Sequence, residues 1–218
     1  MPRLAILTVL IALLGTALPT LSEAQNSPEQ SEAMAVARAV LAKTQWVTEA
    51  QLCPTTVITK REATDHLAAN DCKPGGLSSC LARCSGGVPG SCYWLAYALQ
   101  QQDAPPDSYE SLYQRACKLG VMSGCTNRAA GILVATQGAD ERAQSCAAAT
   151  FEAVCAFDDP WACTVRALHL SRGMGVKQDT ERALRVLAKS CKYGAQDEAC
   201  TYGERIRRDI EAGEQTRK

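Results

Sequence analysis

Apolar residues recur three and four positions apart along most of this chain, with polar residues between them. This spacing places the apolar side chains on one face of an α-helix. In one such stretch the apolar face is formed by Tyr109, Leu112, Tyr113, Ala116 and Cys117. The same spacing predicts a helix that begins after Ser27 and further helices at residues 77–84, 91–102, 125–136, 139–155, 160–172, 180–191 and 195–212. The chain is therefore predicted to be all-α, with Tyr113 in its core.

Residues that cap or stop helices lie at the ends of several of these stretches. Ser27 precedes the sequence Pro-Glu-Gln, and Asp107 has Glu110 three positions later, so both are predicted N-caps. Gly120 and Gly194 are predicted helix stops, because glycine tolerates the left-handed backbone that ends a helix.

The segment 53–76 has no regular pattern. Residues 54–58 could be extended, residues 62–69 could form a helix, and the Lys-Pro-Gly-Gly sequence at 73–76 predicts a turn. We divide the chain after its first 24 residues into a leader segment at 25–76 and a repeat domain at 77–218. The charged last helix is predicted to cap the repeats.

Eight of the twelve cysteines form a repeating pattern. They fall into four pairs whose members are eight or nine positions apart: Cys84 and Cys92, Cys117 and Cys125, Cys155 and Cys163, and Cys191 and Cys200. The first members follow one another by 33, 38 and 36 residues, a period typical of helix-pair solenoids. Each pair joins the last turn of one predicted helix to the first turn of the next, so each is predicted to form a disulfide across a tight turn.

The four remaining cysteines allow three pairings. Cys146 and Cys155 lie on one predicted helix, where nine residues place them on opposite faces and about 13.5 Å apart along the axis. Cys72 and Cys80 repeat the eight-residue spacing. This favours a Cys72–Cys80 bond, which leaves Cys53 to pair with Cys146, and the other two pairings stay open.

The first 24 residues are typical of a secretory signal peptide. Arg3 is followed by an uncharged apolar run at residues 4–18, which is short for a membrane span of about 20 residues. Small residues suit cleavage before Gln25, and an uncleaved anchor is the alternative. Export to an oxidising compartment favours disulfides. We therefore expect a periplasmic or secreted protein with no membrane insertion after signal cleavage.

Charge and ligand spacing argue against two classes of partner. The 23 basic and 23 acidic residues balance, so nucleic acid or an acidic membrane surface is not the expected partner. No Cys-x-x-Cys occurs, and the two histidines, His66 and His169, lie far from any cysteine cluster. Zinc-type ligand spacing is therefore absent, and we expect neither a metal site nor a cofactor.

The most specific motif of the chain lies between residues 162 and 194. Its residues are Gly173, Gly175, Val176, Asp179, Ala183, Cys191 and Gly194. The motif resembles a Sel1-like repeat, and its cysteine-bearing form is similar to the secreted, cysteine-rich Hcp family. The resemblance covers residues 80–212, although the units at 103–107 and 137–140 depart from the motif. It implies a TPR-like α/α superhelix in which the glycines allow sharp turns, Val176 packs in the core and Asp179 caps a helix.

The resemblance implies two possible functions. Sel1-like repeats usually serve as scaffolds that bind a protein or peptide on a concave face, and we expect such a partner in the cell envelope. The alternative is an Hcp-type penicillin-binding protein with weak β-lactamase activity. The chain has no Ser-x-x-Lys, Ser-Asp-Asn or Lys-Thr-Gly motif, and Ser171 cannot pair with His169 two residues away on a helix. We assign no catalytic residue.

Aromatic and basic side chains are the candidates for a binding face. Groove-lining aromatic residues are sought among Tyr93, Trp94, Tyr97, Tyr113 and Trp161. Two arginines at nearby phases of later helices are expected to bind a carboxylate, and a histidine is expected on a helix surface or in the groove. The predicted binding residues are Tyr93, Tyr97, Arg128, Arg166 and His169.

Overall fold

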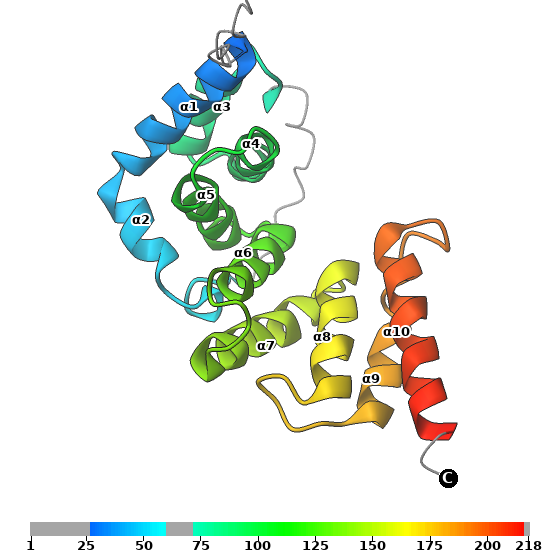
Figure 1. Ribbon diagram of the computed structural model, residues 1–218. Helices are drawn as coiled ribbons and strands as arrows, with labels where there is room; N and C mark the ends of the chain where they lie inside the picture. Colours follow the sequence, from blue (N-terminus) through cyan, green and yellow to red (C-terminus); the bar gives the residue numbers. More distant parts are fainter. Residues whose placement is uncertain (1–26, 60–71, 216–218) are drawn as a thin grey trace, which may run out of the picture.

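The computed structural model describes residues 27–59 and 72–215, and all regular structure in these residues is helical (Figure 1). The elements are α1 (Pro28–Leu41), α2 (Thr44–Ala50), the 3-10 helix η1 (Pro54–Thr56), α3 (Leu77–Ser85), α4 (Pro89–Gln101), α5 (Pro106–Lys118), α6 (Met122–Ala135), α7 (Glu141–Cys155), α8 (Pro160–Arg172), α9 (Thr180–Leu187) and α10 (Glu198–Gln215). The all-α prediction is confirmed. The predicted signal peptide, the helix expected at 62–69 and His66 lie outside the described residues.

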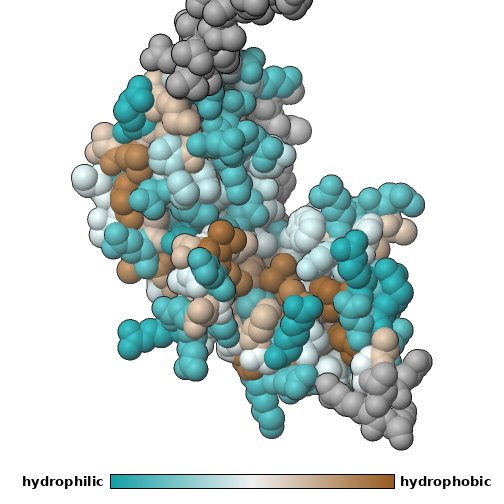
Figure 2. Space-filling view, in the orientation of Figure 1, coloured by the Kyte–Doolittle hydropathy of each residue, from teal (hydrophilic) through white to brown (hydrophobic). Residues whose placement is uncertain are grey.

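Helices that are neighbours in the chain are also neighbours in space. From α3 to α9 each helix packs against the next, and α10 packs on α8 and α9 (Figure 1). Both α1 and α2 pack on α5, so the leader segment shares a core with the first helices of the repeat domain. Figure 2 shows hydrophobic side chains in the hollow between α6 and α10. No helix in the described residues is both long enough and apolar enough to cross a membrane.

Buried aliphatic side chains hold the helices together. Val40, Leu95 and Leu112 have no exposed surface and belong to the cluster that joins α1 to α5. Leu187 packs in a second cluster between α8, α9 and α10. Each such side chain stabilises the fold by about 1.5–3 kcal/mol when it leaves water. Tyr113 is buried as well, which confirms its predicted place in the core.

The helix ends follow the predicted signals except at Asp107 and at Gly194, which lies beyond the end of α9 at Leu187. The Ser27 hydroxyl accepts a hydrogen bond from the Gln30 amide at 3.2 Å, and Gly120 and Gly194 have φ values of 95° and 98°. The prediction that Asp107 is an N-cap is wrong. Helix α5 begins one residue earlier, because Pro106 supplies a φ already suited to the first helical position, and Asp107 lies exposed in the first turn.

All twelve cysteines are paired, and the four repeated pairs are bonded as predicted. Three pairs have the predicted placement, with Cα–Cα distances of 4.6 or 4.7 Å. Cys191 differs, because α9 ends at Leu187 and not at residue 191. Beyond Val186 the backbone tightens into turns whose hydrogen bonds join residues three apart, such as Ser190 N to Leu187 O at 3.1 Å.

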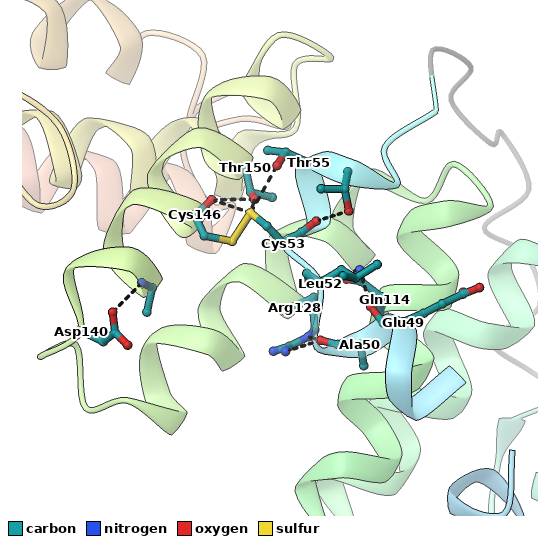
Figure 3. Close-up of a disulfide and its surroundings, with 12 residues drawn as sticks. Glu49, Ala50, Leu52, Cys53, Thr55, Gln114, Arg128, Asp140, Cys146 and Thr150 are labelled. Atoms are coloured by element: carbon teal, nitrogen blue, oxygen red, sulfur yellow. Dashed lines mark hydrogen bonds between the residues drawn. A yellow bond between two sulfur atoms is a disulfide. The ribbon is translucent and has the colours of Figure 1, made fainter. Parts of the chain in front are cut away.

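The favoured pairing of the other four cysteines is also present. Cys72 is bonded to Cys80, and Cys53 is bonded to Cys146 with a Cα–Cα distance of 5.7 Å. The second bond fastens the leader to the middle of α7 (Figure 3). Residues 54–56, considered as a possible extended segment, form η1 instead, while the turn predicted at 73–76 is present.

Candidate aromatic groove

A groove of about 520 Å³ runs along α4, α5, α6 and α8, and we call it the aromatic groove. Its principal side chains are Tyr93, Tyr97, Tyr109, Glu110, Asn127 and Trp161. Tyr97 and Trp161 are 44% and 40% exposed, which is unusual for large aromatic side chains that are not covered by a partner. The groove therefore offers ring faces to a ligand.

The tyrosine rings are held in place by one another. The ring centroid of Tyr113 lies 5.8 Å from that of Tyr93 and 6.4 Å from that of Tyr109, distances typical of stabilising aromatic pairs. The Tyr113 hydroxyl donates a hydrogen bond to Gln100 Oε1 at 2.7 Å. The buried Tyr113 thus supports the two more exposed rings from below.

The hydroxyls of Tyr93 and Tyr113 remain protonated at neutral pH. Burial raises the pKa of Tyr93 and of Tyr113, and a hydrogen bond from the Asn127 side chain opposes the rise in both. These hydroxyls therefore stay available as hydrogen-bond donors and acceptors at neutral pH.

Glu110 is the charged residue of the groove lining. Burial raises the pKa of its carboxyl from 4.5 to about 7, although the nearby Arg128 charge favours ionisation. The carboxyl packs against Gly131 of α6, where a Cβ atom would collide with it. Glycine in the middle of a helix costs about 0.5–1 kcal/mol relative to alanine. Glycine at position 131 therefore destabilises α6 slightly but leaves space for the Glu110 carboxyl.

Arg128, which was predicted to bind a ligand carboxylate, is bonded to partners within the protein. Its Nε and Nη2 donate to the carbonyl oxygen of Ala50 at 3.1 and 2.6 Å, and its Nη1 pairs with Glu110 at 3.2 Å. Gln114 of α5 donates to the carbonyls of Glu49 and Leu52 in the same way (Figure 3). The last carbonyls of a helix lack partners within it, and here side chains of α5 and α6 supply them for α2.

Arg166, which was also predicted to bind a ligand carboxylate, pairs with a carboxylate of the protein itself. It is buried, and its Nη2 lies 2.7 Å from Glu152, a carboxylate that Arg182 contacts at 2.6 Å. Burial lowers the pKa of Arg166, and the Glu152 charge opposes that effect. These side chains line a separate cavity of about 730 Å³ beside α9.

His169 was expected on a helix surface or in the groove. It is instead buried and is not part of the groove lining. Its Nδ1 lies 2.8 Å from the carbonyl oxygen of Met174, and its ring packs on Phe151. Burial lowers the pKa of His169, so the neutral ring donates to this carbonyl. The hydroxyl of Ser171 donates to Leu168 O at 2.9 Å. Neither residue forms part of a nucleophile–base pair.

The repeat phase explains which predicted residues line the groove. Arg128 and Arg166 lie three positions after the second cysteine of their pairs, and so does Leu95, which is fully buried. That phase faces inward. Tyr93 and Asn127, one and two positions after such a cysteine, line the groove, while Trp94, two positions after Cys92, does not.

Tyr93 and Tyr97 are brought together in the groove, and Trp161 joins them. The sequence pattern did not identify three other residues of the groove lining, namely Tyr109, Glu110 and Asn127. Aligning the units on their cysteines could have found Asn127, while the two α5 residues carry no such signal.

Within residues 27–59 and 72–215, no group of three or more His, Cys, Asp or Glu side chains is arranged to hold a metal ion. Comparisons with family models, curated proteins and solved structures find no match to this chain.

Proposed function

We propose that this chain is an exported, disulfide-stapled Sel1-like repeat scaffold that binds a segment of a partner protein in the aromatic groove. The partner would be a protein or peptide of the cell envelope. The observation that carries the proposal is the groove itself, which gathers tyrosine and tryptophan rings from α4, α5 and α8, with Tyr97 and Trp161 exposed. Such rings supply large contact areas with little loss of conformational entropy.

The geometry of the 173–179 loop supports the resemblance to Sel1-like repeats. Gly173 and Gly175 have φ values of 72° and 65°, and Gly175 lies so close to the α7 backbone at Gln144 that a Cβ atom would collide there. Val176 packs in the cluster between α8 and α10, and Asp179 accepts a hydrogen bond from the Arg182 amide at 2.8 Å. These are the roles that the motif implies. Stacked helix pairs with this loop favour a superhelical array.

Six disulfides in a chain of 218 residues support export, because cytosolic thiols are kept reduced. Four of the bonds fasten successive helices at a turn. A rigid array of this kind can present a binding surface without reordering it on binding, which preserves affinity.

The proposal is tested by panning a phage-displayed random peptide library against the oxidised protein. We expect peptides that bind the native protein and lose binding to Tyr97→Ala/Trp161→Ala, two exposed positions whose loss leaves the core intact. Tyr193→Ala is the control, since Tyr193 is 68% exposed and lies outside the groove. Equal binding to both variants, or no enriched peptide, would contradict the proposal.

An assay with a chromogenic cephalosporin tests the alternative. We expect no turnover, because His169 and Ser171 are bonded to backbone carbonyls and do not form a nucleophile–base pair. Hydrolysis that disappears on denaturation would replace the scaffold function with the enzyme function.

A further inference from the structure

The aromatic rings of this chain differ in whether a cation covers them. Outside the groove, Arg115 lies 4.3 Å from the Trp46 ring centroid, Lys192 lies 5.4 Å from that of Tyr193, and Arg205 lies 5.9 Å from that of Tyr202. These are cation–π distances. Among the described residues, no cation is placed over Tyr93, Tyr97 or Tyr109. The groove thus holds ring faces of the kind that the protein elsewhere pairs with its own lysines and arginines.

The charges around the groove are mainly negative. Glu110 lines it, Asp159 acts on the Tyr93 hydroxyl, and Asp103 acts on the Tyr109 hydroxyl. Both carboxylates act in the direction that raises the pKa of these tyrosines. Arg128, the basic partner of Glu110, directs two of its three hydrogen-bonding nitrogens at the Ala50 carbonyl. An anionic ligand would be repelled here, and a cationic one would be attracted.

One oxygen of the Glu110 carboxylate accepts no hydrogen bond from the part of the chain that the structure describes. Its Oε2 accepts from Arg128, while no hydrogen bond from a described residue reaches its Oε1. The side chain is 17% exposed and lines the groove, so the carboxylate is within reach of a ligand there. A carboxylate beside ring faces is a combination suited to an ammonium or guanidinium group, since the rings attract its charge and the carboxylate neutralises it.

We infer that the aromatic groove binds a lysine or arginine side chain of the partner segment, with the cation over the tyrosine faces and beside the Glu110 carboxylate. The inference rests on the proposed function, because it names the chemistry of the segment that the groove accepts. The competing occupant is a neutral, proline-rich or apolar segment, which aromatic grooves also bind.

The test uses the peptides recovered from the phage library at pH 8. We expect them to share a lysine or arginine at one position. In the tightest synthetic peptide, replacing that residue by norleucine keeps the aliphatic stem and removes the charge. We expect binding to weaken at least about fivefold in isothermal titration.

Two pairs of protein variants locate the cation. Glu110→Gln should reduce the preference for the basic peptide to about twofold or less, while Glu211→Gln, the same charge change at an exposed position of α10, should preserve it. Tyr97→Phe keeps the ring face and should retain most of the affinity, and Tyr97→Leu should lose it. The Tyr97 pair keeps the test decisive even if Glu110→Gln fails to fold.

The outcomes separate the two proposals. Enriched peptides without a basic residue, or equal affinity for the lysine and norleucine forms, overturn the inference and leave the peptide-binding scaffold standing. A library that yields no peptide specific for the groove overturns both.

Discussion

At the scale of single residues, Glu110 shows burial competing with a counter-ion. Removal from water raises the pKa of its carboxyl to about 7, even though Arg128 lies at 3.2 Å. The pair spans eighteen residues of sequence and two helices. Its position could not be predicted from local spacing, because it depends on how α5 and α6 cross.

The raised pKa of Glu110 predicts a stability that increases as the pH falls. Its folded pKa of about 7 exceeds the ordinary 4.5, so the folded protein binds a proton that the unfolded chain releases. At about 1.36 kcal/mol for each pKa unit, the free energy of unfolding gains roughly 3 kcal/mol between pH 8 and pH 4.5. Urea unfolding of the wild-type protein and of Glu110→Gln at pH 8 and pH 5 measures most of this gain as the difference between the two.

The variants Glu110→Gln and Glu211→Gln provide the comparison. Glu110→Gln should remove this rise in stability, whereas Glu211→Gln should keep it. His169 acts in the opposite direction in both variants, because burial lowers its pKa and its contribution to stability falls as the pH drops below the ordinary 6.5, so the difference between the variants isolates Glu110. The pKa of Glu49 is lowered, so Glu49 stabilises the folded protein at every pH above 4.5. This stabilisation is lost only below pH 4.5, outside the window that is compared. If Glu110→Gln leaves the pH dependence of the free energy of unfolding unchanged, the proton taken up on folding belongs to a group other than Glu110.

Arg128 supports a second prediction at this scale. Arg128→Met removes the donors to Ala50 and leaves Glu110 without its counter-ion, so we expect a loss of about 2–4 kcal/mol at pH 8. Arg185→Met is the control. Arg185 is paired with Glu181 on the surface, and its loss should cost no more than about 1 kcal/mol. Chemical denaturation measures both, and equal losses would refute the capping role of Arg128.

At the scale of helices and loops, sequence reasoning worked where the signal was local. The bounds of α8 agree with the prediction at both ends, because Pro160 starts the helix and Gly173 accepts the left-handed backbone that stops it. Local reasoning was wrong where two signals competed. Pro106 displaced Asp107 from the cap, and the turn that leads to Cys191 shortened α9.

The loop between α8 and α9 supports a third prediction. Gly175 has a positive φ and touches the α7 backbone, whereas Gly194 has a positive φ and open space around its Cα hydrogens. Both Gly→Ala changes strain the backbone by about 1–2 kcal/mol. Gly175→Ala also forces the loop away from α7, so we expect it to cost at least about 1 kcal/mol more than Gly194→Ala. Thermal unfolding of the two variants tests this difference, and equal melting temperatures would contradict the close packing of loop and helix.

At the scale of the whole molecule, the disulfide framework was predictable and the candidate groove was only partly so. Regular cysteine spacing identifies the staples, since bond geometry requires that the residues be near in space. Side-chain partners from distant helices decide whether an arginine faces a ligand or a neighbouring carboxylate. Arg166 and its partner Glu152 belong to different helices, and no periodic feature marks their contact.

The two kinds of disulfide should differ in their contribution to stability. The Cys53–Cys146 bond closes 93 residues of chain, and each short staple closes eight or nine. The chain-entropy model gives about 4–5 kcal/mol for the long loop and about 2–3 kcal/mol for a short one. Cys53→Ser/Cys146→Ser should therefore lower the free energy of unfolding more than Cys155→Ser/Cys163→Ser, as measured by guanidinium unfolding without reductant. The reverse order would mean that native packing outweighs loop entropy here.

The bond between Cys53 and Cys146 also decides how the molecule carries mechanical load. If the two ends of the chain are pulled apart, the covalent path runs through α1 and α2, crosses the sulfur atoms, and leaves through the second half of α7. Helices α3 to α6 lie between the two bonded cysteines in the sequence and are therefore outside this path. The tyrosines on α4 and α5 would therefore hold their positions while tension on the rest of the protein rises.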